Sequence, residues 1–323
     1  MNYVLLIIGF AMLVKGADWF VDGAAGIARK LGIPQLVVGL TIVAMGTSAP
    51  EAAVSITAAM KGNAGITIGN VVGSNILNIL IILGITGTIA SVAIQRSTFR
   101  CEIPYMILIT VVLLVMGYDG TIVLWEGIIL WALFLLYLGY LFVLARKKDT
   151  VGADSSSTAG QSDMPVSASD TDSVEQRSIP LLLLLTVLGG IIVVWGSDIT
   201  VDSATALAKT FGMSERFIGL TIVALGTSLP ELFTSVSAAR KGNADIAIGN
   251  IVGSNIFNIL FVIGTTALIT PVVYQSGFII DGFVAIGAGL LLWIAVAKRK
   301  VLKHPWGIIM LLSYVGYFVY LLM

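Results

Sequence analysis

TIVAMGTSAPE at residues 41–51 and TIVALGTSLPE at residues 221–231 are two copies of one segment, separated by 180 residues. The match runs without a gap through residues 41–83 and 221–263, where about two-thirds of the positions are identical. KGNA, IGN and VGSNI recur within it. A period this long does not fit a solenoid, and two copies indicate the duplication of half of a membrane transporter.

The composition of the chain is that of a protein surrounded by lipid. Its 323 residues are 57% hydrophobic and 11% charged, whereas about 25% of the residues of a soluble domain are charged. Apolar runs of about 20 residues, each long enough to cross a hydrocarbon layer roughly 30 Å thick, recur along the chain. We therefore expect an all-α polytopic membrane protein with about ten transmembrane helices. The runs lie near residues 3–28, 34–60, 65–90, 104–117, 122–145, 180–208, 213–239, 245–270, 278–297 and 305–323.

A hydrophilic segment separates the first five runs from the last five. Residues 146–178 are rich in Ser, Asp and Thr and have almost nothing to bury, which is typical of a flexible linker. The sequence thus predicts a first five-helix repeat at 1–145, the linker, and a second five-helix repeat at 179–323. No basic region precedes the first apolar run, so we expect a retained helix and not a cleaved signal peptide.

The distribution of Lys and Arg predicts the orientation of the two repeats. Five spans in each half make the second copy enter the membrane from the opposite face. Loops on one side then carry fourteen Lys and Arg residues and loops on the other side only Lys61, Lys209 and Arg216, while Lys15 lies inside the first span. Because basic loops stay in the cytoplasm, we expect both termini outside the plasma (inner) membrane and a cytoplasmic linker.

Each copy of the opening segment places a carboxylate inside a span. Glu51 and Glu231 follow Pro50 and Pro230 directly, and an ionisable group at membrane depth is expensive unless it has a function. Proline removes a backbone donor from a helix, which should free carbonyls near Ala44–Gly46 and their repeat equivalents. The residues within about one turn of each acid are Thr47, Ser48, Thr227 and Ser228.

The segments IGNVVGSNILN and IGNIVGSNIFN supply further oxygen atoms. Polar residues recur there at every fourth position and form one stripe along an otherwise apolar helix. The stripes consist of Asn70, Ser74 and Asn78 in one copy and Asn250, Ser254 and Asn258 in the other. Glycines in the same segments allow close helix packing; they are Gly69, Gly73, Gly249 and Gly253.

Together these segments predict a cation site at mid-membrane. Carboxylates, hydroxyls, amide oxygens and freed carbonyls form an all-oxygen shell, which suits a hard cation such as Ca²⁺ and, by the same logic, Na⁺. Two glutamates also neutralise one divalent ion at low dielectric. A single kinked helix with one Glu could instead be a buried hydrogen-bonding device, but the duplication favours the ion site. Four more acids, Asp18, Asp22, Asp198 and Asp202, fit either interface ion pairs or an ion pathway, and Lys15 could pair with Asp18.

Other classes of protein find little support. Cys101 is the only cysteine, which excludes an intrachain disulfide and a thiolate metal cluster. His304 is the only histidine and falls in a loop, and neither HExxH nor GxSxG is present, so an enzyme is not expected. The formal net charge is +0. We expect no nucleic-acid partner, no cofactor and no obligatory protein partner.

The repeated GTSxPE and GNxVGSNIxN segments resemble the α-repeats of the cation/calcium exchanger superfamily, in particular the prokaryotic members of its sodium/calcium exchanger branch. The resemblance implies ten helices as two inverted repeats, ion sites between four core helices, and alternating access by sliding of the first and sixth helices. It implies that Glu51 and Glu231 are ligands shared by Ca²⁺ and Na⁺. It also implies flanking ligands at Thr47, Ser48, Thr227, Ser228, Ser74, Ser254, Asn78, Asn258 and the carbonyls of Ala44 and Ala224.

The function implied is an antiporter that exchanges Na⁺ for Ca²⁺ across the cytoplasmic membrane. Some family members have Asp where this chain has Asn78 or Asn258, which leaves open an H⁺/Ca²⁺ or a K⁺-dependent Na⁺/Ca²⁺ exchanger with the same site. A cation channel would share the polar stripes, but broken helices and occluding acids favour a transporter.

Overall fold

The computed structural model describes residues 2–60, 65–146, 177–211 and 224–322, and within them almost every residue is helical. The predicted all-α class is confirmed. The first half contains α1 (Asn2–Leu31), α2 (Gln35–Val38), η1 (Gly39–Val43), α3 (Ala44–Thr47), α4 (Ala49–Met60), α5 (Gly65–Leu77), η2 (Asn78–Ile82), α6 (Leu83–Ile89), β1 (Val92–Ala93), η3 (Thr98–Glu102), α7 (Ile103–Met116), η4 (Gly117–Asp119), β2 (Thr121–Ile122) and α8 (Leu124–Arg146). The second half contains α10 (Ile179–Thr210), α12 (Ala224–Thr227), α13 (Leu229–Arg240), α14 (Ala244–Phe257), η6 (Asn258–Ile263), α15 (Gly264–Ile269), β3 (Val272–Val273), α16 (Gly277–Ala297), β4 (Val301–Leu302) and α17 (His304–Leu322).

Eight helical stretches of the described residues are long and apolar enough to cross a membrane, and a ninth results if a bent pair counts as one span. That pair, Gln35–Thr47 and Ala49–Met60, bends by 50°. The predicted span at 213–239 falls partly on residues 212–223, outside the described residues, and α12 and α13 form its described part. Most of the predicted linker at 146–178 also lies outside them. The polytopic fold is consistent with ten helices in two inverted repeats.

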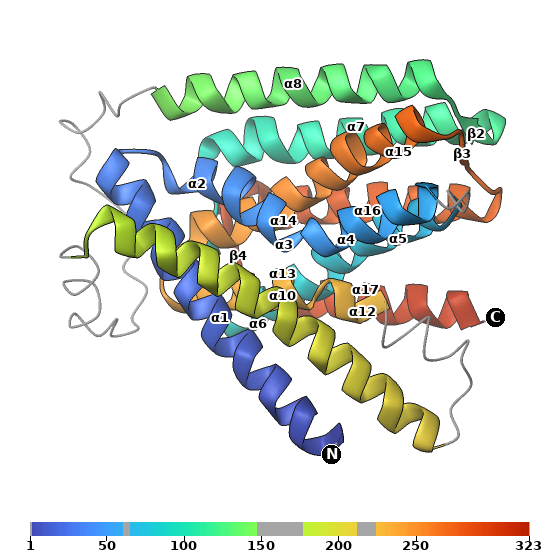
Figure 1. Cartoon of the computed structure of the whole chain (residues 1–323). Coiled ribbons are helices and arrows are strands. Elements are labelled where there is room, and N and C mark those ends of the chain that lie inside the picture. The colour runs from blue at the N-terminus through green and yellow to red at the C-terminus, as the bar shows by residue number, and fades with distance from the viewer. Residues whose placement is uncertain (1, 61–64, 147–176, 212–223, 323) are drawn as a thin grey trace.

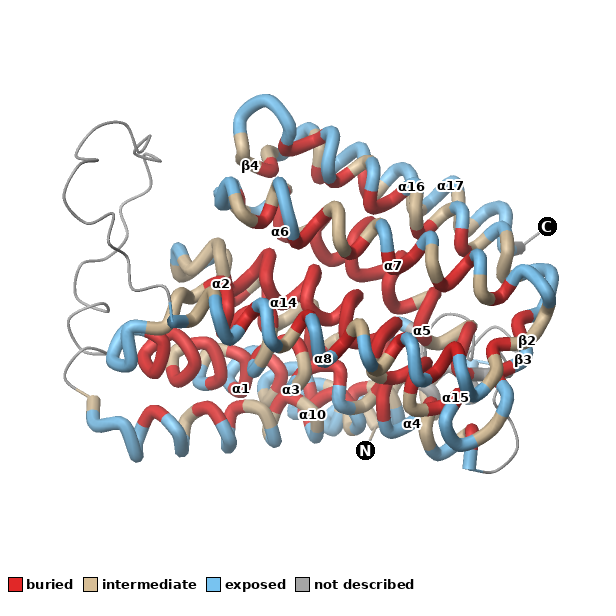
Figure 2. Tube along the Cα trace, turned by 90° about the horizontal axis from the view of Figure 1, so that it is seen from above, coloured by how far each residue is buried: buried red, intermediate tan, exposed pale blue. Residues whose placement is uncertain are grey.

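The spans that carry the GNxVGSNIxN motif lie at the centre of the molecule. In the span at 244–269, 94% of the most apolar window is buried inside the protein, and in the span at 67–89 the share is 72%, against 11–39% for the other six. Figure 2 shows the same contrast, with α14 and α5 mostly buried and the outer helices exposed along one side. The polar stripes are therefore surrounded by protein and kept away from lipid.

Helices α1 and α10 pack along each other and cross the remaining helices obliquely (Figure 1). A Cβ at Gly9 would approach the backbone of Thr200 to 3.0 Å, and one at Gly189 would approach the backbone of Phe20 to 2.4 Å. Glycines seven residues apart on both helices, Gly9, Gly16 and Gly23 on α1 with Gly189 and Gly196 on α10, bring the two backbones together. Close packing of this kind joins α1 and α10 into one packed pair, the α1–α10 unit.

Two short strand pairs join the halves and show that they are inverted. β1 pairs with β4, and β2 pairs with β3. By the 180-residue shift β1 is equivalent to β3, and β2 to β4. Each strand thus pairs with the equivalent of its neighbour, and equivalent strands lie at opposite ends of the molecule, as β4 and the β2–β3 pair do in Figure 1. The pairs also unite loops that the Lys and Arg count placed on the same side.

Small residues of α14 let it lie directly on the backbone of η1 and α3. A Cβ at Gly253 would lie 2.8 Å from the Cα and carbonyl oxygen of Leu40 and 2.8 Å from the Cβ of Ala44. The equivalent contacts of Gly73 would involve residues near 220, which lie outside the described residues. At Gly253 the predicted close packing is therefore present.

This contact gives a stability prediction. Gly253→Ala should lower the free energy of unfolding by about 1–3 kcal/mol, because the new methyl group meets backbone that cannot move aside. Gly139→Ala in α8 is the matched control, since no atom lies within 4 Å of its Cβ position. Thermal unfolding in detergent should show a lower Tm for the first variant and an unchanged or higher Tm for the second. Equal Tm values would contradict the packing described.

Candidate cation site

Both copies of GTSxPE contain a break in the helix at the serine. Ser48, between α3 and α4, has φ −84° and ψ 7°, and Ser228, between α12 and α13, has φ −93° and ψ 4°. Each proline two residues later cannot donate to the carbonyl four residues before it. In the second copy that carbonyl, of Gly226, accepts a hydrogen bond of 2.6 Å from the Ser197 hydroxyl of α10. The break thus bends the helix and exposes backbone oxygen atoms to neighbouring side chains.

The two glutamates are buried and are contacted across the two halves. Glu51 is 1% exposed and Glu231 is 0% exposed. Ser48 donates a hydrogen bond of 2.7 Å to Oε1 of Glu231, and Ser228 donates one of 3.3 Å to Oε1 of Glu51. Each carboxylate is therefore held by the broken helix of the other half, so the site exists only where the two repeats meet.

Two asparagines form hydrogen bonds to α4 and α13, the helices that carry the glutamates. Asn70 donates to the Ser55 hydroxyl at 2.9 Å and to the backbone carbonyl of Glu51 at 3.2 Å. Asn250 repeats the pattern with Ser235 at 2.9 Å and the Glu231 carbonyl at 3.4 Å. The Oδ1 of Asn250 also accepts a hydrogen bond of 3.0 Å from Thr47. These asparagines position the acids from the next helix.

A pair of asparagines crosses at the centre of the protein. The side-chain amide of Asn75 donates to the backbone carbonyl of Asn255 at 3.2 Å, and Asn255 donates to the carbonyl of Asn75 at 3.2 Å. Asn78 donates to Oδ1 of Asn255 at 2.9 Å, and Asn258 donates to Oδ1 of Asn75 at 3.2 Å. Asn78 and Asn258 each begin a π-helical stretch, a local widening that is common at functional sites.

Four buried oxygen atoms of the predicted ligand residues have no hydrogen-bond partner among the described residues. They are Oε2 of Glu51, Oε2 of Glu231, Oδ1 of Asn78 and Oδ1 of Asn258. All four are acceptors, and they form two pairs related by the repeat. A buried polar group without a partner costs about 1–3 kcal/mol, and more when it is charged. A bound cation would stabilise these four acceptor oxygen atoms.

The remaining predicted ligands lie around the same place. Ser254 donates to the Ala44 carbonyl at 3.4 Å, and that carbonyl also accepts the backbone N–H of Ser48 at 3.0 Å. Ser228 lies 3.5 Å from the Ser74 hydroxyl. The structure thus brings the predicted residues of α3, α4, α5 and α14 together with Ser228 and Glu231. Thr227 ends α12 and is half-buried, and Ala224 begins α12.

Four polar residues of the region were missed by the sequence analysis. Asn75 and Asn255 lie beside the predicted stripe, and Ser55 and Ser235 lie one turn after the glutamates. All four are buried. A signal was present, because each is identical in both copies inside an apolar span; the search for i, i+4 spacing alone passed over it.

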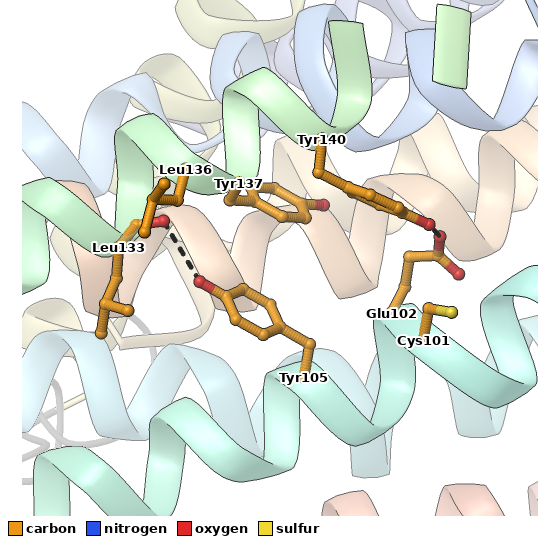
Figure 3. A pocket seen from close by; sticks show the side chains of 7 residues that line it. All are labelled: Cys101, Glu102, Tyr105, Leu133, Leu136, Tyr137 and Tyr140. Carbon is orange, nitrogen blue, oxygen red and sulfur yellow. Dashed lines mark hydrogen bonds between the residues drawn. The ribbon is translucent and has the colours of Figure 1, made fainter. Parts of the chain in front are cut away.

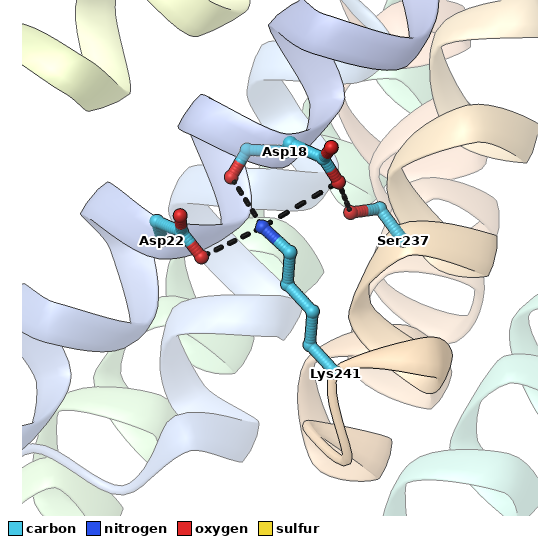
Figure 4. Close-up of polar contacts among 4 residues, drawn as sticks. All are labelled: Asp18, Asp22, Ser237 and Lys241. Carbon is cyan, nitrogen blue, oxygen red and sulfur yellow. Dashed lines mark hydrogen bonds and ion pairs between the residues drawn. The ribbon is translucent and has the colours of Figure 1, made fainter. Parts of the chain in front are cut away.

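The four aspartates of α1 and α10 behave differently from one another. Lys241 bonds to Asp22 at 2.7 Å and lies 3.4 Å from Asp18, which also accepts a hydrogen bond of 2.6 Å from Ser237 (Figure 4). These contacts tie α1 to α13, so Asp18 pairs with Lys241 and not with Lys15. Asp198 and Asp202, their equivalents on α10, are exposed, and neither forms an ion pair with another described residue. Lys61, the equivalent of Lys241, lies outside the described residues.

Comparison with known proteins extends over nearly the whole chain. A family model described as sodium/calcium exchanger protein matches residues 1–143 and 181–323. The inner membrane protein YrbG of Escherichia coli is 38% identical over 294 residues, 90% of this chain and 88% of that protein. The sodium/calcium exchanger MaX1 of Methanosarcina acetivorans is 32% identical and covers 99% of this chain and 98% of its own length. A structure of the sodium-calcium exchanger NCX_Mj, soaked with Na⁺ and Sr²⁺, superimposes with a TM-score of 0.82 at 30% identity, covering 98% and 97% of the two chains.

Proposed function

The chain belongs to the sodium/calcium exchanger family, and on that premise we propose that it exchanges Na⁺ for Ca²⁺ across the plasma membrane by alternating access. The observation that carries the proposal is the set of four unpartnered buried acceptors on Glu51, Glu231, Asn78 and Asn258. The proposed ligands also include the hydroxyls of Thr47, Ser48, Ser74, Thr227, Ser228 and Ser254 and the carbonyls of Ala44 and Ala224. Ca²⁺ and Na⁺ both prefer such oxygen shells.

Charge balance makes the two ions competitors. With Ca²⁺ between them, the carboxylates of Glu51 and Glu231 are neutralised, and with Na⁺ they require more than one ion. Within the described ranges no group of three or more His, Cys, Asp or Glu side chains is placed to hold a metal ion, and the proposed shell is therefore completed by neutral oxygens. An empty site leaves two carboxylates unpaired in a buried passage, and that cost opposes movement of the unloaded protein and thus leak.

Movement of the α1–α10 unit would provide alternating access. The Asp18, Asp22, Lys241 and Ser237 contacts hold α1 against α13 at one end, while Asp198 and Asp202 at the equivalent place on α10 are exposed. Among the described residues, ion pairs thus hold the α1 side of the unit, whereas the partner that Lys61 could offer to the α10 side lies outside the described ranges. In the state that opens to the opposite side of the membrane, we expect Lys241 to be separated from Asp18 and Asp22.

We further propose that both termini lie outside and that residues 146–178 connect the repeats in the cytoplasm. The count of Lys and Arg supports this orientation. The two strand pairs fit it, since each joins loops assigned to the same side.

Because the side chains of Asn78 and Asn258 are neutral, a transport assay is needed to identify the counter-ion. Purified protein in liposomes loaded with Na⁺ should take up ⁴⁵Ca²⁺ from a Na⁺-free medium, and collapse of the Na⁺ gradient should stop uptake. Equal uptake from K⁺-loaded liposomes would overturn sodium antiport. Uptake driven by a pH gradient alone would identify a proton/calcium exchanger, and a requirement for both K⁺ and Na⁺ would identify the potassium-dependent type. Flux that needs no counter-ion gradient would identify a channel.

A further inference from the structure

Asn75 and Asn255, which are not among the proposed ligands, form the centre of two chains of hydrogen bonds. Asn75 lies on α5 and Asn255 on α14, and they are 3% and 1% exposed. Each comes three residues before a proposed ligand, Asn78 or Asn258, which is also buried. Because all four side chains are amides, each can turn either its oxygen or its NH₂ group toward a given neighbour.

A backbone carbonyl determines which way round the first amide lies. The carbonyl of Asn255 accepts a hydrogen bond of 3.2 Å from the side chain of Asn75. A carbonyl oxygen can only accept, so this contact requires the NH₂ group of Asn75 and turns its Oδ1 to the other side. Asn258 donates to that Oδ1 at 3.2 Å, which requires the NH₂ group of Asn258 as well. The other end of the Asn258 amide, its Oδ1, is left without a partner among the described residues.

The second chain repeats the first with the two halves exchanged. The carbonyl of Asn75 accepts a hydrogen bond of 3.2 Å from the side chain of Asn255. Asn78 in turn donates to Oδ1 of Asn255 at 2.9 Å, and Oδ1 of Asn78 has no partner among the described residues. The proposed ligand of each repeat is thus oriented by an asparagine of the other repeat, and each chain begins at a carbonyl, which cannot exchange donor for acceptor.

The direction of the two ligand amides decides whether they attract or repel a cation. With Oδ1 free, Asn78 and Asn258 each offer an oxygen acceptor, as a hard cation requires. Turned over, each would present two N–H donors. Because the site is buried, water cannot screen the resulting repulsion. Hydrogen bonds that orient metal ligands are common, and loss of such a partner lowers metal affinity about 10–100-fold.

We propose that Asn75 and Asn255 are positioning residues for the transported cation. Asn255 holds Oδ1 of Asn78 toward the ion, and Asn75 holds Oδ1 of Asn258 toward it. The inference rests on the proposed function, in which Asn78 and Asn258 are ion ligands. Neither positioning residue contacts the ion, and each acts through the ligand of the opposite repeat.

The test is a double-mutant cycle, measured as equilibrium binding of ⁴⁵Ca²⁺ to the purified protein in Na⁺-free detergent solution. Asn255→Ala removes the acceptor that orients Asn78 and keeps the backbone carbonyl that orients Asn75. We expect the dissociation constant to rise about 10-fold. Asn78→Asp puts a carboxylate at the ligand position, and since both of its oxygens are acceptors it needs no such orientation. In that background Asn255→Ala should change the dissociation constant less than about threefold.

The crossed arrangement of the two chains supplies the matched control. Asn258→Asp is the same chemical change, but Asn258 is oriented by Asn75. Asn255→Ala should therefore still raise the dissociation constant about 10-fold in the Asn258→Asp background. Asn75→Ala should show the reverse, with its effect lost beside Asn258→Asp and kept beside Asn78→Asp. A purely structural role would give equal losses in all backgrounds, because it does not depend on which ligand carries the carboxylate.

Tyr140→Phe controls for the loss of a buried hydrogen bond outside the cation site. Tyr140 of α8 donates to Glu102 of η3 at 2.6 Å, and Figure 3 shows the two side chains meeting between these helices. This variant should lower the Tm in detergent, since it leaves the carboxyl of Glu102 with one partner fewer. Its dissociation constant for Ca²⁺ should equal that of the wild type.

Failure of the positioning role and failure of the proposed function give different results. Absence of saturable Ca²⁺ binding by the wild type would refute the proposed function, on which the inference rests. Binding by the wild type, with the same effect of Asn255→Ala in all three backgrounds, would overturn the positioning role alone. The elution profile in detergent shows which variants are folded, and if Asn255→Ala does not fold, the Asn75→Ala series decides the question by itself.

Discussion

Glu51→Gln and Glu231→Gln are each expected to abolish Na⁺-driven Ca²⁺ uptake while the protein remains folded. Either change leaves one carboxylate to balance a divalent ion in a buried site. Removing one partner of a buried ion pair costs about 3–5 kcal/mol, which is roughly a 150- to 4,000-fold loss of affinity. A comparable loss should appear in both variants, because each acid is buried and accepts a hydrogen bond from the serine of the other repeat.

Folding should survive because glutamine keeps the contact that positions each side chain. Its amide oxygen accepts the hydrogen bond that Ser228 gives to Glu51, or Ser48 to Glu231. Uptake of ⁴⁵Ca²⁺ into liposomes measures function, and the elution profile and Tm in detergent measure folding. Glu126→Gln, a buried acid outside the site, should transport Ca²⁺ as the wild type does. Normal transport by either site variant would show that the glutamates are not the ion ligands.

Linking α1 to α13 by a short bridge is expected to stop exchange completely. The predicted cycle requires Lys241 to leave Asp18 and Asp22, which it contacts in this structure. In a Cys101→Ser background, the pair Asp22→Cys and Lys241→Cys should be joined by a short bifunctional methanethiosulfonate. Uptake should then fall to that of protein-free liposomes and return after reduction.

The single-cysteine variants separate the bridge from simple modification. Asp22→Cys alone and Lys241→Cys alone react with the reagent but cannot bridge the helices, so they should keep exchanging ions. Uptake that continues after complete cross-linking would mean that α1 and α13 stay together throughout the cycle. That result would refute the movement of the α1–α10 unit without affecting the assignment of the cation site.

The sequence predicted the parts of the fold that depend on local chemistry. Glu51 and Glu231 were recognisable as functional residues because a carboxylate in an apolar span is energetically expensive. Pro50 and Pro230 predicted the helix breaks beside them. Duplication and an odd number of spans then implied inversion, which the strand pairs confirm. Each of these inferences needs only the order of the residues.

Contacts between segments that are distant in the chain could not be predicted from the sequence. The crossing of Asn75 and Asn255 depends on how α5 meets α14, and no spacing within either helix reveals it. Lys241 is the partner of Asp18, although Lys15 stands three residues away on the same helix, because the packing of α13 on α1 brings the Lys241 amine to 3.4 Å from the carboxylate.

The way each half completes the other has an evolutionary consequence. Ser48 serves the glutamate of the second repeat, Ser228 serves that of the first, and β1 finds its partner only in β4. A single five-helix ancestor therefore had to work as a homodimer of two copies inserted in opposite directions. Such a protein cannot carry a strong excess of Lys and Arg on one side, since that excess would fix a single orientation. The marked bias of the present chain requires two copies whose sequences can differ from each other, which a duplicated and fused chain provides.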